Sequence, residues 1–241
     1  MRATVSTVPA GLASPRTRAR LTGLVYLLFF ATAVLGAVIA PGISGPGVTG
    51  DAAATANNIV AHESSFWLGW ALSLASTAFY VALMGLFYQL FKPVSRTLAL
   101  LALLFGIVGC AVTAFGSLFQ LGPLVILRGG PYLSVFNAKQ LQALALMFLN
   151  LNVQVGYIAL VFFGVFQIAL GYMIWRSGFL PRILGALIAL AGVGWLTFLS
   201  PPLATHLLGP LEVLGIVAEG SLMLWLLVMG VDSERWNRAA R

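Results

Sequence analysis

The sequence predicts an all-α membrane protein, a six-transmembrane-helix bundle with both termini in the cytoplasm. Two compositional observations indicate this class: 60% of the 241 residues are hydrophobic and only 8% are charged, and the mean hydropathy is +0.99. A chain of that composition has too little polar surface to dissolve in water as a globule. The third observation is a series of apolar runs, each long enough to cross a hydrocarbon core about 30 Å thick.

The chain divides into one integral membrane domain, residues 21–231, between two polar cytoplasmic tails, residues 1–20 and 232–241. The first tail ends in RTRAR and is expected to be disordered. The apolar run behind it is longer than the apolar region of a signal peptide, and Pro41 follows it directly, so we interpret it as an uncleaved span. The six predicted spans are residues 21–40, 66–91, 97–121, 153–175, 183–199 and 211–231.

Three outer connections join these spans. Residues 41–65 start Gly- and Pro-rich, and the Ala-rich stretch after Asp51 is typical of a short helix on the membrane surface. Residues 122–152 contain a loop with Pro and Gly breaks, followed by a helical pattern. We expect an outer, partly interfacial helix that leads into the fourth span. The last outer loop is bracketed by Pro201, Pro202 and Pro210.

The basic residues are distributed unevenly between the two predicted sides. Only Arg128 and Lys139 fall on the outer side, and this asymmetry is the positive-inside pattern of a plasma-membrane protein. The net charge of +7 is therefore explained by anchoring to the bilayer, and no nucleic-acid partner is predicted. The single cysteine, Cys110, excludes an internal disulfide, and no cofactor motif is present. The eleven basic residues on the cytoplasmic side are Arg2, Arg16, Arg18, Arg20, Lys92, Arg96, Arg176, Arg182, Arg235, Arg238 and Arg241.

Glu219 is the most informative polar residue, because ionisable groups inside a membrane are costly and usually have a role. It lies about 12 Å into the sixth predicted span at ~1.5 Å per residue, with no basic residue predicted at its depth. It is either a proton- or cation-binding carboxyl, or a neutral acid that hydrogen-bonds a neighbouring helix. Glu212 lies two turns earlier on the same face, and it also suits the first turn of a helix for structural reasons.

Other polar side chains lie at a similar depth on the second, third and fourth spans. We hypothesise an outward-opening polar cup walled by spans two, three, four and six, with Glu219 at its floor. The alternative is that these groups only join helices to one another. The predicted ligand-binding residues are Glu219, Glu212, Gln154, Tyr157, Gln120, Ser117, Thr113, Asn150 and Tyr80.

Weaker signals accompany this hypothesis. His62, Glu63 and His206 lie in predicted outer loops and, with Glu212, are a poor candidate for a metal site, so no metal is predicted. Gln89 and Gln167 are interpreted as packing contacts.

Small residues share one face of the fifth span and one face of the fourth. Such faces are typical of close helix contact or of an oligomer interface. These small residues are Gly185, Ala189 and Gly192, and Gly164 and Gly171.

Three functions remain open on the sequence alone. The favoured one is a protein that binds or moves a small amphiphile, a cation or a proton through the cup. A membrane partner protein would instead dock through the small-residue faces, and would tolerate the loss of Glu219. A membrane enzyme is less favoured, because only Cys110, Ser117 or the loop histidines could supply a nucleophile or a metal ligand.

Four stretches of the chain carry a family resemblance, and RSGFLPRILG and EGSLMLWLL are their most specific parts. They resemble the bacterial multi-pass membrane proteins grouped as the domain of unknown function 4386 family. The resemblance implies the fold and the location, and no activity. Gly106 and Phe166 stand where the family pattern often has arginine and histidine, so no function of those groups is carried over. The stretches are ARLTGLVYLLF at 19–29, FYQLFKPVSRTLALLALLF at 87–105, FFGVFQIALGYMIWRSGFLPRILGALIALAGVGWL at 162–196 and AEGSLMLWLLVMGV at 218–231.

Overall fold

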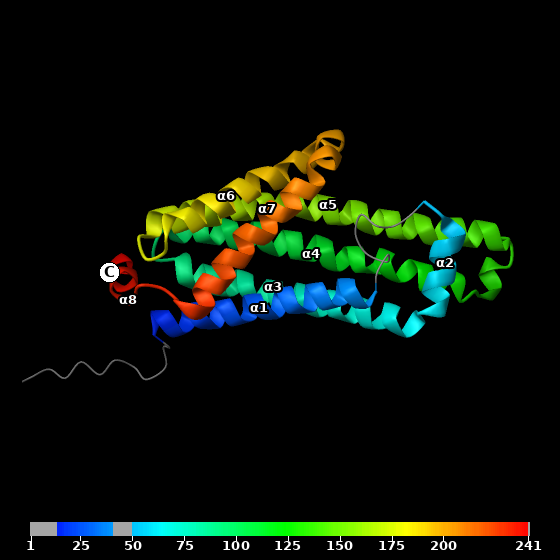
Figure 1. The fold of residues 1–241 in the computed structure, drawn as a ribbon, viewed down its shortest axis with the longest axis horizontal. Coiled ribbons are helices and arrows are strands. Elements are labelled where there is room, and N and C mark those ends of the chain that lie inside the picture. Colours follow the sequence, from blue (N-terminus) through cyan, green and yellow to red (C-terminus); the bar gives the residue numbers. More distant parts are fainter. Residues whose placement is uncertain (1–13, 41–49, 241) are drawn as a thin grey trace, which may run out of the picture.

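The computed structural model describes residues 14–40 and 50–240, and helices make up most of them. Six of the described helices are long and apolar enough to cross a membrane, which confirms the predicted all-α bundle of six such helices. They lie side by side in one elongated bundle (Figure 1). The six helices are α1 (Pro15–Ile39), α3 (Glu63–Phe91), α4 (Arg96–Leu127), α5 (Ala138–Ser177), α6 (Arg182–Leu196) and α7 (Pro201–Val228).

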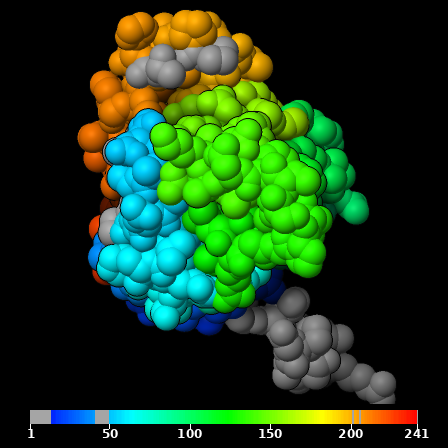
Figure 2. All heavy atoms as spheres, turned by 90° about the vertical axis from the view of Figure 1, so that its right-hand side faces the viewer, coloured from blue at the N-terminus to red at the C-terminus, as the bar shows by residue number. Residues whose placement is uncertain are grey.

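Short helices lie at the two ends of the bundle, which we call the α2 end and the α8 end. At the α2 end, α2 (Ala52–Ala61) is capped by Asp51, whose carboxylate accepts hydrogen bonds from two backbone amides of the first turn. Its buried Ile59 packs in a cluster with residues of α3, α4 and α5, and Figure 2 shows α2 lying against α4 and α5. The predicted surface helix therefore covers this end of the bundle.

At the α8 end, the last helix, α8 (Ser233–Ala239), is joined to the hairpins by side-chain hydrogen bonds. Trp236 Nε1 donates to the Leu90 carbonyl over 2.9 Å, and Arg235 donates to the Gly178 carbonyl over 2.9 Å. The second predicted tail is therefore partly helical. The basic residues of the α3–α4 and α5–α6 turns lie at this same end of the bundle, together with the start of α1.

Several predicted boundaries are wrong where a helix continues past a breaker. Ser14 caps α1, so RTRAR is helical and not disordered. The helix α7 begins at Pro201, ten residues before the predicted span, because proline is tolerated in the first turn of a helix. Pro210 lies inside that helix. Residues 1–13 of the predicted tail and 41–49 of the first loop lie outside the described residues.

The helix predicted within 122–152 is present and leads into the fourth span, but no break separates the two. The helix α4 runs on to Leu127, and α5 starts at Ala138 and continues without a break for 40 residues. A capping box formed by Asn137 and Gln140 starts α5. At about 1.5 Å per residue, α5 is about 60 Å long, roughly twice the thickness of a hydrocarbon core. Its first part therefore extends α5 beyond the predicted span and packs along α4.

Glycines set the closest helix contacts in the bundle. A Cβ added to Gly171 of α5 would lie 2.5 Å from the carbonyl oxygen of Gly185 of α6. A Cβ at Gly164 would lie 2.8 Å from the carbonyl oxygen of Gly192. The small-residue faces of the fourth and fifth predicted spans therefore pack against each other within the chain. This contact brings α6 close enough to α5 to help enclose the cavity described next.

Candidate functional site

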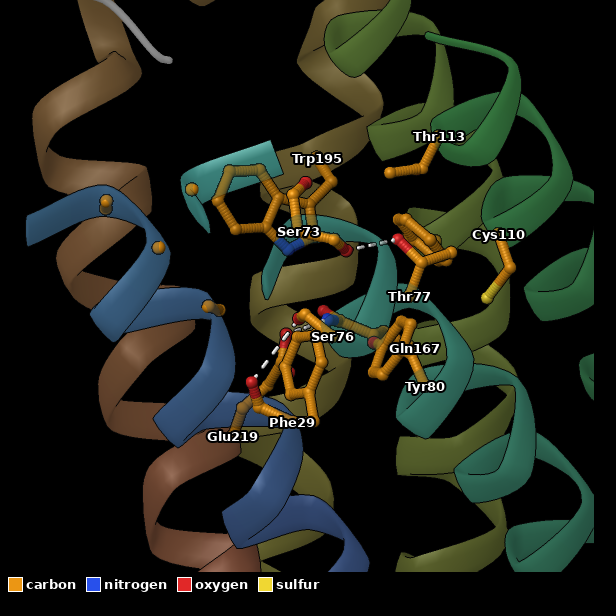
Figure 3. Close-up of a pocket in the computed structure, with 15 residues that line it drawn as sticks. Phe29, Ser73, Ser76, Thr77, Tyr80, Cys110, Thr113, Gln167, Trp195 and Glu219 are labelled. Carbon is orange, nitrogen blue, oxygen red and sulfur yellow. Dashed lines mark hydrogen bonds between the residues drawn. The ribbon is translucent and has the colours of Figure 1, made fainter. Parts of the chain in front are cut away.

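Glu219 of α7 lies at the centre of the bundle and accepts two strong hydrogen bonds. The Tyr26 hydroxyl of α1 donates to Glu219 Oε2 over 2.6 Å. The Gln167 amide of α5 donates from Nε2 to Glu219 Oε1 over 2.6 Å (Figure 3). Three helices that are far apart in the sequence thus meet on one carboxyl group. Hydrogen bonds donated to a carboxylate are of the stronger, charge-assisted kind.

A close crossing of α1 and α7 makes the contact between Tyr26 and Glu219 possible. Gly23 lies directly against the backbone of Leu226 and Leu227, so that any side chain there would collide with α7. Tyr26 lies three residues further along α1 and therefore on the same face. Its ring is buried and packs edge to face on Phe87 of α3, with ring centroids 5.8 Å apart. The hydroxyl is thereby held towards Glu219.

A cavity of about 270 Å³ adjoins Glu219 and is lined by residues of all six long helices. Four aromatic rings form part of its wall, and small residues of α1 and α3 form another part. None of the described lining residues is basic, and Glu219 is the one acidic residue among them. The aromatic lining residues are Phe29, Tyr80, Phe163 and Trp195, and the small ones are Ala33, Gly36, Ala37 and Gly69.

Three of the five hydroxyl groups on the cavity wall donate hydrogen bonds to backbone carbonyls. Ser76 donates to the Phe29 carbonyl of α1 over 3.3 Å. Thr77 and Thr113 each donate to the carbonyl four residues earlier in their own helix, over 3.0 Å in both cases. A hydroxyl oxygen that donates in this way keeps lone pairs with which it can accept. The three hydroxyls therefore contribute acceptors to the cavity.

Gln167 adds a further acceptor. Its Nε2 is used by Glu219, while its Oε1 is buried and accepts no hydrogen bond from any described residue. A buried carbonyl oxygen without a donor costs about 1–3 kcal/mol. The site therefore favours a ligand that brings its own N–H or O–H groups.

The predicted single cup is divided in the structure into three adjoining hollows. Glu219, Tyr80 and Thr113 line the cavity already described. Ser117 and Gln120 line a second hollow of about 130 Å³, which shares Ser73 and Thr113 with the first.

Tyr157 and Glu212 line a third hollow of about 270 Å³, between α5, α6 and α7. Trp195 lines both this hollow and the first cavity. Glu212 is exposed and lies well inside α7, so its interpretation as a residue of the first helical turn is wrong. The helix begins eleven residues earlier than Glu212, at Pro201.

Two predicted residues line none of these three hollows. Asn150 is exposed, and its side-chain amide donates to the Leu146 carbonyl of its own helix. Gln154 is also exposed. Their four-residue spacing places them on one face of α5, and the structure turns that face outward. Among the residues that the structure describes, no three histidine, cysteine or acidic side chains lie close enough together to hold a metal ion.

Sequence reasoning missed two residues that contact Glu219. The first span was not expected to contribute to the site, yet α1 supplies Tyr26. Gln167 was interpreted as a packing contact, yet it hydrogen-bonds the central carboxyl. A signal was available in both cases, because each is an isolated polar side chain within an apolar span and needs a hydrogen-bonding partner there.

Comparison with known proteins gives one match. The sequence profile described as domain of unknown function (DUF4386) matches residues 21–230. No curated protein and no solved structure matches the chain. The matched region covers all six long helices except the start of α1, and it includes Tyr26, Gln167 and Glu219. The six-helix bundle with a carboxyl group at its centre therefore belongs to the DUF4386 family of multi-pass membrane proteins.

Proposed function

We propose that the protein is a plasma-membrane protein that binds a small organic ammonium ion in the cavity beside Glu219. In this proposal the α2 end faces outward and both termini lie in the cytoplasm. The observation that carries the proposal is a carboxyl group among acceptor oxygens in a cavity with no basic residue among its described lining residues. Glu219, Gln167 Oε1 and the hydroxyl oxygens are acceptors, and no described lining residue is basic.

An ammonium ion suits this arrangement in charge and in geometry. Its N–H groups can donate to Glu219 and to the free Gln167 Oε1 at the same time, and its positive charge balances the carboxylate in a medium of low dielectric constant. The hydrogen bonds from Tyr26 and Gln167 hold the Glu219 carboxyl in place. An anion would meet the carboxylate without a compensating positive group.

The aromatic wall supports the same ligand class. Phe29 and Tyr80 stack with ring centroids 4.4 Å apart, and Phe163 lies edge to face on Tyr80 at 5.1 Å. Aromatic faces attract organic cations, by about 0.5–2 kcal/mol for each contact. The cavity volume of about 270 Å³ limits the part of the ligand that is enclosed to a small group.

The test is binding of phenethylammonium to the purified protein in lipid nanodiscs, measured by isothermal titration calorimetry. Glu219→Gln keeps the shape and removes the charge, and we expect it to weaken binding by at least tenfold, since a charge-assisted hydrogen bond contributes about 1.5–3 kcal/mol. The matched control is Glu212→Gln, which makes the same change to the acid of the neighbouring hollow. Its affinity for phenethylammonium is expected to stay within twofold of the wild-type value. Equal affinities of the wild type and Glu219→Gln would contradict the proposal.

The partner-protein alternative has less support. It relies on the small-residue faces of α5 and α6, and these contact each other at Gly171 and Gly185 and again at Gly164 and Gly192. An oligomer would therefore need a different surface of the bundle.

A further inference from the structure

The helices α1 and α7 touch near the α8 end and separate towards the α2 end. Near the α8 end, Gly23 lies against the backbone of Leu227, and Arg20 donates a hydrogen bond to the Val228 carbonyl over 3.1 Å. Glu219 and Tyr26 make the next contact along the pair. Figure 1 shows α7 crossing the bundle obliquely, from α1 at one end to the far end of α6.

Beyond Glu219 the two helices pack on different neighbours. On α7, Gly215 lies against the Trp195 ring of α6, and Leu211 packs on Gly194 of the same helix. On α1, Gly36 lies against α3, where a Cβ would be 3.3 Å from the Leu72 side chain. The outer parts of α1 and α7 therefore form a fork whose vertex is at Glu219.

Apolar residues on both arms of the fork are exposed. Tyr26, Ala33 and Ala37 repeat at intervals of seven and four residues, so they share one face of α1. Ala33 and Ala37 line the Glu219 cavity, and Ala37 is exposed. On α7, Ile216 lies three residues before Glu219, on the same face, and is 63% exposed. The cavity is thus continuous with an apolar surface on the side of the bundle.

We propose that this fork is a lateral entrance from the lipid phase, and that the ligand is an amphiphilic primary amine. Its ammonium group binds Glu219 and Gln167, and its alkyl chain lies in the fork against Ala33, Ala37 and Ile216. This inference rests on the proposed function, and adds to it the ligand class and the route. Such amines concentrate in membranes because each methylene group favours transfer out of water by about 0.8 kcal/mol.

The physical reason for a lateral route is that the side chains along the fork are apolar. A cation that entered the fork from water would pass exposed apolar side chains that offer it no hydrogen bond. An amphiphile already in the bilayer keeps its chain in a hydrocarbon-like environment throughout, and only its head group exchanges partners. The small side chains of Ala33 and Ala37 leave room for that chain, while a bulky residue at either position would fill it.

The test compares ethylammonium with decylammonium on the protein in nanodiscs. Ala37→Trp is designed to fill the mouth of the fork, and Val38→Trp places the same side chain one residue further, on a face that is 68% exposed. Because Ala37 also lines the cavity, the expected effect is a difference between the two ligands: Ala37→Trp should weaken decylammonium binding at least tenfold more than it weakens ethylammonium binding. Val38→Trp should leave both affinities within twofold. Each amine partitions equally into nanodiscs of the same lipid, so a difference in affinity between a variant and the wild type is due to the protein.

The outcomes separate this inference from the proposed function. Glu219→Gln could weaken the binding of both amines while Ala37→Trp changes the affinity for neither. In that case the carboxyl binds cations and the proposal of a lateral entrance is wrong. Equal weakening of both amines by Ala37→Trp also contradicts the entrance, because the change then acts on the head-group site. If Glu219→Gln affects neither amine, both proposals fail. Should Ala37→Trp not fold, Ala37→Leu must give the same order of effects with a smaller magnitude.

Discussion

Glu219 illustrates how far a single residue can be interpreted from sequence. An acid in the middle of an apolar span is visible without a structure, and the cost of an ionisable group in a membrane predicts that it has polar partners. Its partners were not predictable, because Tyr26 and Gln167 lie 193 and 52 residues away in the chain. Periodicity places a residue on a face of its own helix, but it does not say which helix lies opposite.

Tyr26→Phe tests the contact at the residue scale. The change removes the hydroxyl that donates to Glu219 and keeps the ring that packs on Phe87. We expect the free energy of unfolding to fall by about 1–2 kcal/mol, because the carboxyl loses one of its two donors. Phenethylammonium affinity should fall several-fold, because Glu219 is less firmly held.

The matched control for Tyr26→Phe is Tyr172→Phe. The Tyr172 hydroxyl also takes part in a hydrogen bond, accepting from Arg176, but the residue is 50% exposed. Chemical denaturation in mild detergent and calorimetry should show little change for this variant. A Tyr26→Phe protein as stable as the wild type would mean that its hydroxyl does not hold Glu219 in place.

At the scale of the elements, the sequence identified the long helices but misplaced several of their ends. Pro201 and Pro202 were interpreted as loop residues, although the first turn of a helix does not need their missing N–H groups. The helical stretch 138–152 was predicted as a separate helix before the fourth span. It contains no proline or glycine, and α5 runs through both without a break. The small-residue faces were recognised, and the structure shows that α5 and α6 use them on each other.

Gly171→Ala tests this helix pair. Its Cβ would lie 2.5 Å from the Gly185 carbonyl oxygen and 2.6 Å from the Ala189 amide nitrogen, so α5 and α6 must move apart. We expect a clear loss of thermal stability and weaker ligand binding, because Trp195 of α6 lines the cavity. The control is Gly85→Ala, whose Cβ would meet nothing within 4 Å.

Gly85→Ala should leave stability unchanged or raise it by up to about 1 kcal/mol, since alanine favours a helix over glycine. Thermal unfolding followed by circular dichroism measures both variants. If the two changes lowered the unfolding temperature equally, the close contact of α5 and α6 would not be the cause.

At the scale of the whole molecule, the charge pattern and the fold agree. Nine of the eleven basic residues predicted for one side lie on segments that the structure brings to the α8 end, while Arg128 and Lys139 lie near the α2 end. The other two, Arg2 and Arg241, lie outside the described residues. Arg128 forms an ion pair with Glu63 there, which joins the end of α4 to the start of α3. Such a distribution predicts a cytoplasmic α8 end.

Orientation is tested by labelling single cysteines in intact cells. In a Cys110→Ala background, Ser134→Cys at the α2 end should react with a membrane-impermeant maleimide, and Asn237→Cys at the α8 end should react only after the cells are opened. Both positions are exposed in the structure, so access is decided by the membrane alone. The reverse pattern would invert the topology and place the fork in the inner leaflet.

The sequence by itself determined that this is a bundle of membrane-spanning helices, because a backbone in hydrocarbon must satisfy its hydrogen bonds within each segment. It also determined that Glu219 needs partners. Only the tertiary structure decided which partners these are, and that the predicted cup is three hollows. The physical reason is that helices in lipid are apolar on every side, so their sequence periodicity does not specify neighbours. The close crossing at Gly23, and the divergence of α1 and α7 beyond it, decided where the cavity lies.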